Sequence, residues 1–173
     1  MRGRGLRFTD AKAYYDEVAR FGFRYGPSFR VIEELWSGYG EALARIRLPD
    51  PLVMDAAAYR VHPVLLDGCL QVQGASLLAS RTGVEEQGMY VPVSIERIDL
   101  QVQPGTQLWV YSKLRPASNE GLERIVGDIA VWNAEGEGVA RIEGLAVGRT
   151  SEQVLHGIQM TINGISAGLR NSG

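Results

Sequence analysis

The chain has 173 residues, of which 45% are hydrophobic and 22% are charged, and its formal net charge at pH 7 is −2. This size and composition predict one globular domain with a proper core, and the slightly negative charge argues against nucleic acid as a partner. One cysteine and two histidines exclude an internal disulfide and give no recognisable metal site, and no apolar run reaches the roughly 18 residues that span a membrane.

The first residues, MRGRGLRFTD, carry positive charge but lack the apolar core of a secretion signal. We therefore expect a soluble cytoplasmic protein, or a piece of one. Residues 1–8 are predicted to be a linker, residues 9–150 one domain, and residues 151–173 a tail that is partly disordered. The sequence has no glycine motif for binding a dinucleotide or a phosphate, so no bound cofactor is expected.

The N-terminal region predicts a helix followed by a rigid turn. The segment TDAKAYYDEVARFG is typical of a helix, with Thr9 as its N-cap and Gly22 at its end. The next segment, FRYGPSFR, is predicted to turn at Pro27 between the aromatic residues Tyr25 and Phe29.

A strand, a loop and a long helix are predicted next. The segment EALARIRL, residues 41–48, alternates apolar and polar side chains as a half-buried strand does. The loop PDPLVMDAAAYR leads to Pro63, which suits the first position of a helix, and the apolar pattern continues to about Ser80.

Four segments with the alternation of strands follow the long helix, with turns between them. Their sequences are SIERIDLQVQ, TQLWVYSKLR, RIVGDIAVWN and VARIEGLAVGR. In the first of them the apolar face consists of Ile98, Leu100 and Val102. A strand, one long apolar helix and four antiparallel strands predict an α+β hotdog fold, in which the sheet wraps around the helix. A ferredoxin-like fold would need a second long helix between the later strands, and the sequence offers none.

An acid stands inside the otherwise apolar start of the long helix, in HPVLLDGCLQ, residues 62–71. Asp67 and Gln71 are four residues apart and project from the same face, so the Gln71 amide can donate to the Asp67 carboxyl. Gly68 and Cys69 leave room nearby for a ligand or another chain. Burial would raise the pKa of Asp67, as an acid catalyst near neutral pH requires, whereas the helix N-terminus would lower it. From spacing alone, a structural role for Asp67 is as plausible as a catalytic one.

Three motifs in this order resemble those of the dehydratase domains of modular polyketide synthases. HPVLLDGCLQ resembles the family signature HPxxLDxxxQ, YGPSF (residues 25–29) resembles YGPxF, and YVPVSIERI (residues 90–98) resembles LPxSxxxx. The similarity extends from about Thr9 to Arg149. It implies a hotdog unit that is the second of two fused in one domain.

The resemblance also implies a reaction and roles for single residues. The family removes water from a 3-hydroxyacyl chain, held as a thioester on the phosphopantetheine arm of an acyl carrier protein, and forms a 2,3-unsaturated chain. Asp67 matches the aspartate that helps the β-hydroxyl leave, and Gln71 the residue that positions it. The residues matched to the substrate tunnel and its surroundings are Tyr25, Pro27, Phe29, His62, Leu66 and Pro92.

The base histidine of the family belongs to the first hotdog, in the motif HxxxGxxxxP, and this chain has no such motif. His62 matches a histidine that is usually structural, and His156 lies in the predicted tail. The chain is therefore expected to be a half-domain. It would be an excised piece, a natural split partner of a first-half protein, or a unit that pairs with a second copy of itself.

Other functions stay open at this stage. Relatives with this fold also act as double-bond isomerases, pyran-forming cyclases or branching domains on similar tethered chains. A non-catalytic hotdog that binds a carrier protein is a further alternative.

Overall fold

The structure is a computed structural model that describes residues 5–80, 89–102, 104–116 and 124–150. Its helices are α1 (Ala11–Arg20) and α2 (Pro63–Ser80), with two 3-10 segments, η1 (Pro27–Phe29) and η2 (Asp50–Ala58). The strands are β1 (Arg7–Thr9), β2 (Ile32–Gly38), β3 (Glu41–Arg47), β4 (Met89–Ser94), β5 (Arg97–Leu100), β6 (Gln107–Leu114), β7 (Arg124–Asn133) and β8 (Gly138–Thr150). The predicted tail, residues 151–173, lies outside the described residues.

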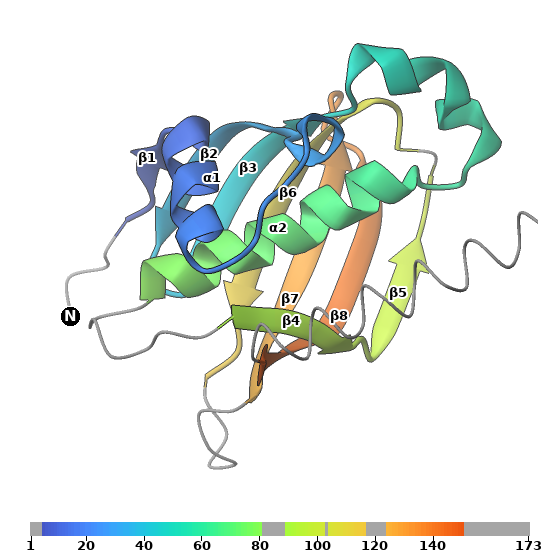
Figure 1. Cartoon of the computed structure of the whole chain (residues 1–173). Coiled ribbons are helices and arrows are strands. Elements are labelled where there is room, and N and C mark those ends of the chain that lie inside the picture. The colour runs from blue at the N-terminus through green and yellow to red at the C-terminus, as the bar shows by residue number, and fades with distance from the viewer. Residues whose placement is uncertain (1–4, 81–88, 103, 117–123, 151–173) are drawn as a thin grey trace, which may run out of the picture.

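The strands form one antiparallel sheet in the order β1-β2-β3-β6-β7-β8-β4, and β5 also pairs with β8. The long helix α2 lies across one face of this sheet, and α1 lies beside it near β2 (Figure 1). This is the predicted α+β hotdog layout. None of the described helices is long and apolar enough to cross a membrane.

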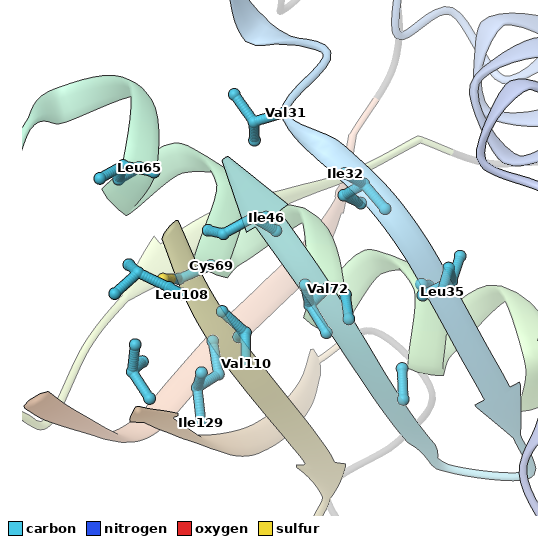
Figure 2. Packing of buried hydrophobic residues seen from close by; sticks show 14 of the residues in the cluster. Val31, Ile32, Leu35, Ile46, Leu65, Cys69, Val72, Leu108, Val110 and Ile129 are labelled. Carbon is cyan, nitrogen blue, oxygen red and sulfur yellow. The ribbon is translucent and has the colours of Figure 1, made fainter. Parts of the chain in front are cut away.

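The core lies between α2 and the sheet (Figure 2). Leu65, Cys69 and Val72 of α2 are buried against strand residues such as Ile46 and Val110, because the alternation of β3 and β6 turns their apolar side chains toward the helix.

Gly68 lets the helix approach the sheet closely. A Cβ atom at this position would lie 2.5 Å from Val31 Cγ2 and 3.0 Å from Ile46 Cδ1. The expectation that Gly68 and Cys69 leave room for a ligand or another chain is therefore wrong. The space at Gly68 is filled by Val31 and Ile46, and the Cys69 side chain is buried in the core.

The N-terminal region differs from the prediction in the residue that caps α1 and in the presence of the strand β1. The carboxylate of Asp10 accepts the Ala13 backbone N–H at 2.9 Å and caps α1. The prediction of Thr9 as the cap is wrong, because Thr9 ends β1. Arg7 and Phe8, which the predicted linker included, pair with β2.

The long strand β8 has two partners along one edge. Residues 140–143 pair with β5, residues 146–150 pair with β4, and Gly144 stands between them with a φ of 62°. The predicted strand SIERIDLQVQ is thus shortened to Arg97–Leu100, and β4 precedes it as a strand that the sequence analysis missed. Ile98 faces Ile142 across the β5–β8 pair, so both project on the side of the sheet that α2 covers elsewhere. Ile142 is buried, whereas Ile98 is 43% exposed.

Candidate active site

A cavity of about 300 Å³ lies between α1, α2, the strands β4 and β8, and the segment 23–30, which we call the aromatic turn. One wall is aromatic and aliphatic, and the polar groups come mainly from α2. The lining residues are Tyr14, Val18, Phe21, Phe23, Tyr25, Asp67, Leu70, Gln71, Gln73, Gly74, Leu77, Leu78, Tyr90, Pro92, Leu145 and Val147. Such a pocket, mostly apolar with a few convergent polar groups, is typical of a binding site for a small molecule.

Asp67 and Gln71 meet in this cavity as the helical spacing predicts. Gln71 Nε2 donates to Asp67 Oδ2 at 2.7 Å and to the Phe29 carbonyl oxygen at 2.9 Å. The Tyr15 hydroxyl donates to Gln71 Oε1 at 2.9 Å. The amide side chain of Gln71 is thus held from three sides, and it holds one oxygen of the acid in turn.

Two influences act on the Asp67 carboxyl in opposite directions. Burial raises its pKa above the ordinary value, and the hydrogen bond from Gln71 lowers the pKa by favouring the anion. Burial is the larger influence, so the net change is upward. An acid in this environment is better suited to give a proton near neutral pH than an exposed aspartate.

The other predicted site residues separate into two groups. Tyr25 and Pro92 line the cavity, and Pro92 is also exposed to solvent, which places it where the cavity opens. Pro27 and Phe29 are exposed and do not line the cavity, although the Phe29 backbone carbonyl binds Gln71.

His62 and Leu66 do not line the cavity either. The Nδ1 atom of His62 accepts the Val64 backbone N–H at 3.2 Å, and its ring packs edge-on against Tyr59. His62 therefore caps the start of α2, because the first N–H groups of a helix lack partners within the helix. Leu66 packs against the core.

The sequence analysis missed the two tyrosines of α1. The Tyr14 hydroxyl donates to the Gln71 backbone carbonyl at 2.8 Å, and Tyr15 binds the Gln71 side chain. The available signal was the position of both on the buried face of a helix, since a buried tyrosine hydroxyl usually has a hydrogen-bond partner.

Thiol and metal chemistry find no support in the part of the chain that the structure describes. Burial raises the pKa of the Cys69 thiol to about 12, which keeps it protonated and unreactive. No group of three or more His, Cys, Asp or Glu residues in the described ranges is arranged to hold a metal ion.

Comparisons with known proteins agree on one family. A family model described as the polyketide synthase dehydratase N-terminal domain matches residues 2–156. The chain is 30% identical over 141 residues to polyketide synthase GfsE of Streptomyces halstedii, which covers 82% of this chain and 4% of the synthase. It is 34% identical over 141 residues to polyketide synthase ThaG of Burkholderia thailandensis, covering 79% of this chain and 2% of that synthase.

Solved structures give the same result. The dehydratase domain from the CurK module of curacin polyketide synthase is 31% identical with a TM-score of 0.70, over 85% of this chain and 49% of that one. GphF dehydratase 1 is 26% identical with a TM-score of 0.72, over 87% of this chain and 53% of that one. The chain thus spans about half the length of the solved dehydratases that it matches.

Proposed function

Because this chain belongs to the polyketide synthase dehydratase family, we propose that it is the acid-bearing half of such a dehydratase. The substrate would be a 3-hydroxyacyl thioester on the phosphopantetheine arm of an acyl carrier protein, and the chain would need no cofactor of its own. The observation that carries the proposal is Asp67, the one carboxylic acid among the described residues that line the cavity.

The proposed reaction is an elimination of water. A base removes the proton from the α-carbon, and its electron pair forms the double bond to the β-carbon. The bond from the β-carbon to the hydroxyl oxygen breaks, and Asp67 gives that oxygen a proton so that it leaves as water. Gln71 would keep the carboxyl pointing to the reacting atoms, and Tyr25 would form part of the wall beside it.

The base is expected from a separate hotdog. A histidine-to-phenylalanine variant and an aspartate-to-asparagine variant of the CurK dehydratase are both described as inactive mutants. This chain offers an aspartate in the cavity, but His62 caps a helix outside it. We propose that a first-half hotdog with the motif HxxxGxxxxP supplies the histidine. The matching family model is described as an N-terminal domain, so the assignment to the second half depends on the sequence motif around Asp67.

A part of the sheet that the described residues leave exposed supports the proposal of a second hotdog as partner. Ile98 and Leu100 of β5, together with Val102 two residues beyond its end, are here called the β5 stripe, and each is between 41 and 46% exposed. Ile98 and Leu100 lie opposite Ile142 and Ala140, which belong to or pack against the core. Ile98 and Leu100 thus continue the core-facing side of the sheet beyond α2, and a second hotdog would bury them together with Val102. A second copy of this chain is the alternative occupant.

The test is dehydration of a 3-hydroxyacyl chain on a carrier protein, followed by mass spectrometry, with this chain alone and with a first-half hotdog. We expect loss of one water only in the mixture. Asp67→Asn should then lower the rate by about 10²- to 10⁴-fold, the usual contribution of a general acid. Asp55→Asn, at an exposed position in η2, is the matched control and should keep full turnover.

Other outcomes would point elsewhere. Full turnover by Asp67→Asn would remove Asp67 from the mechanism. Water loss by the chain alone would mean that its own residues or a second copy supply the base. A product of unchanged mass with a moved double bond or a new ring would replace dehydration by isomerisation or cyclisation, and unaltered substrate would favour a carrier-binding role.

A further inference from the structure

The hydrogen bonds around Gln71 begin at the backbone of β2. The Ile32 backbone N–H donates to the Tyr15 hydroxyl oxygen at 3.1 Å, and the Tyr15 hydroxyl donates to Gln71 Oε1 at 2.9 Å. Gln71 Nε2 donates to Asp67 Oδ2 at 2.7 Å. Three elements, β2, α1 and α2, are thus joined in one line of donors that ends at the acid.

The direction of this line is fixed at both ends. A backbone N–H can only donate, so the Tyr15 oxygen accepts from Ile32 and the Tyr15 proton is left for Gln71. The other end of the amide meets a carboxyl oxygen and the Phe29 carbonyl oxygen, and both are acceptors. All of these contacts are satisfied only when Oε1 faces Tyr15 and the NH₂ group faces Asp67.

We propose that Tyr15 is a positioning residue, whose hydroxyl keeps the Gln71 amide in the orientation that donates to Asp67. Gln71 then occupies Asp67 Oδ2, so the proton of the neutral acid is carried by the other oxygen, Oδ1. Without the hydroxyl, the bond to the Phe29 carbonyl is what still holds the NH₂ group in place. A rotation of the amide by half a turn then sacrifices that bond but lets Oε1 accept the acid proton on Oδ2. That rotation would take the Gln71 NH₂ donor away from the ionised Asp67 carboxylate. In the neutral acid it would turn the proton toward Gln71 instead of the cavity.

Among the described residues, four groups that respond to the charge of Asp67 titrate well above the range of a carboxyl. The titratable groups that face it from packed elements are Tyr14 and Tyr15 of α1, Tyr25 before η1, and Cys69 of α2. Burial raises the pKa of each, to about 12 for Tyr15 and Cys69, so all four stay neutral where a carboxyl titrates. The Arg30 guanidinium lies 5.7 Å from the centre of the Tyr15 ring.

The test is a titration of the Asp67 ¹³C-carboxyl signal by NMR, assigned with Asp67→Asn. Tyr15→Phe should raise the proton affinity of Asp67 by roughly three- to tenfold, about the worth of one hydrogen bond. Gln71→Leu should raise it similarly, and adding Tyr15→Phe to Gln71→Leu should raise it no further, since Tyr15 acts through Gln71. An additive effect of the two changes, or no effect of Tyr15→Phe, would overturn the proposal.

Tyr14→Phe is the matched control. It removes a buried hydroxyl from the neighbouring position, and the lost bond goes to the Gln71 backbone rather than its side chain. It should lower stability as Tyr15→Phe does and leave the Asp67 titration unmoved. If Tyr15→Phe does not fold, the orientation of the Gln71 amide can still be tested by NMR on the unaltered chain. One Gln71 side-chain NH₂ proton should shift with the ionisation of Asp67, and its failure to do so would contradict the orientation.

The effect of Tyr15 on catalysis rests on the proposed function, whereas its effect on the Asp67 titration does not. With the first-half hotdog added, Tyr15→Phe should lower kcat for dehydration roughly three- to tenfold at constant KM. Full turnover by Asp67→Asn would defeat the proposed function and leave the NMR result standing. Suppose instead that Asp67→Asn loses turnover, while Tyr15→Phe keeps both its kcat and the Asp67 titration of the unaltered chain. That result would defeat only the role of Tyr15.

Discussion

Asp67 is a carboxyl whose pKa is raised by partial burial, although Gln71 donates a hydrogen bond to it. Catalysis and stability make opposite demands on such a group. A raised pKa keeps a proton available near neutral pH, but the ionised form is less well solvated in the folded chain than in the unfolded one. The folded state therefore bears a cost at neutral pH that an amide at the same position would avoid.

The pH dependence of stability follows from the sign of this shift. Below the unfolded pKa the carboxyl is protonated in both states, and Asp67 costs nothing. As the pH rises through the folded pKa, the unfolded state gains more from ionisation, so stability falls. Asp67→Asn should be more stable than the unaltered chain at pH 7.5, and by less at pH 4.5, in urea unfolding at both values. A stability loss at pH 7.5 would mean that the hydrogen bond from Gln71 outweighs burial.

Part of the site could be predicted from the sequence and part could not. The contact between Asp67 and Gln71 follows from a separation of four residues on one helix, which fixes their common face. The contacts of Gln71 with Tyr15 and with the Phe29 carbonyl join residues 56 and 42 positions apart, and only the packing of α1 and η1 on α2 creates them. The role of His62 as a cap is likewise decided by the backbone geometry at the start of α2.

At the scale of elements, the segments with a regular apolar periodicity were predicted correctly, and two strands whose periodicity is interrupted were missed. The bounds of α2 and the strands β3, β6 and β7 agree with their periodicity. The sequence analysis missed β2, where two adjacent glutamates at a register shift break the alternation, and β4, which contains Pro92. Proline is tolerated in β4 because this strand lies at the end of the sheet, where an N–H is not needed for a ladder.

The close approach of α2 to the sheet gives a test at the same scale. Gly68→Ala adds a methyl group against Val31 and Ile46, which should cost about 1–3 kcal/mol through overpacking. The better helix propensity of alanine returns at most about 1 kcal/mol. We expect a net loss in urea unfolding.

Gly74→Ala in the same helix is the comparison for Gly68→Ala. Its nearest new contact would be the Tyr14 hydroxyl at 3.3 Å, so the cost should be smaller while the helix-propensity gain is equal. A Gly68→Ala variant that is as stable as the Gly74→Ala variant would mean that α2 can move away from Val31 and Ile46.

In the whole molecule, α2 covers only the middle of one face of the sheet. The β5 stripe lies beyond α2 and is not covered by any of the described residues. If a first-half hotdog buries this surface, Ile98→Thr with Leu100→Thr should weaken the complex, because each change removes apolar area while threonine keeps the strand preference. The loss should be about 1–2 kcal/mol per side chain, or roughly five- to thirtyfold in Kd for each. Sedimentation velocity of the mixture over a range of concentrations measures it.

The control for this prediction is Tyr39→Ser, which removes another large exposed side chain, 62% accessible, from the turn between β2 and β3. It should leave the complex unchanged. Weakening of self-association instead of the mixed complex would identify a second copy of this chain as the occupant of the stripe. If neither association changes, the partner binds another face. The walls of the cavity that α2 does not supply are α1, the aromatic turn, β4 and β8, so the partner would then complete the cavity from one of those sides.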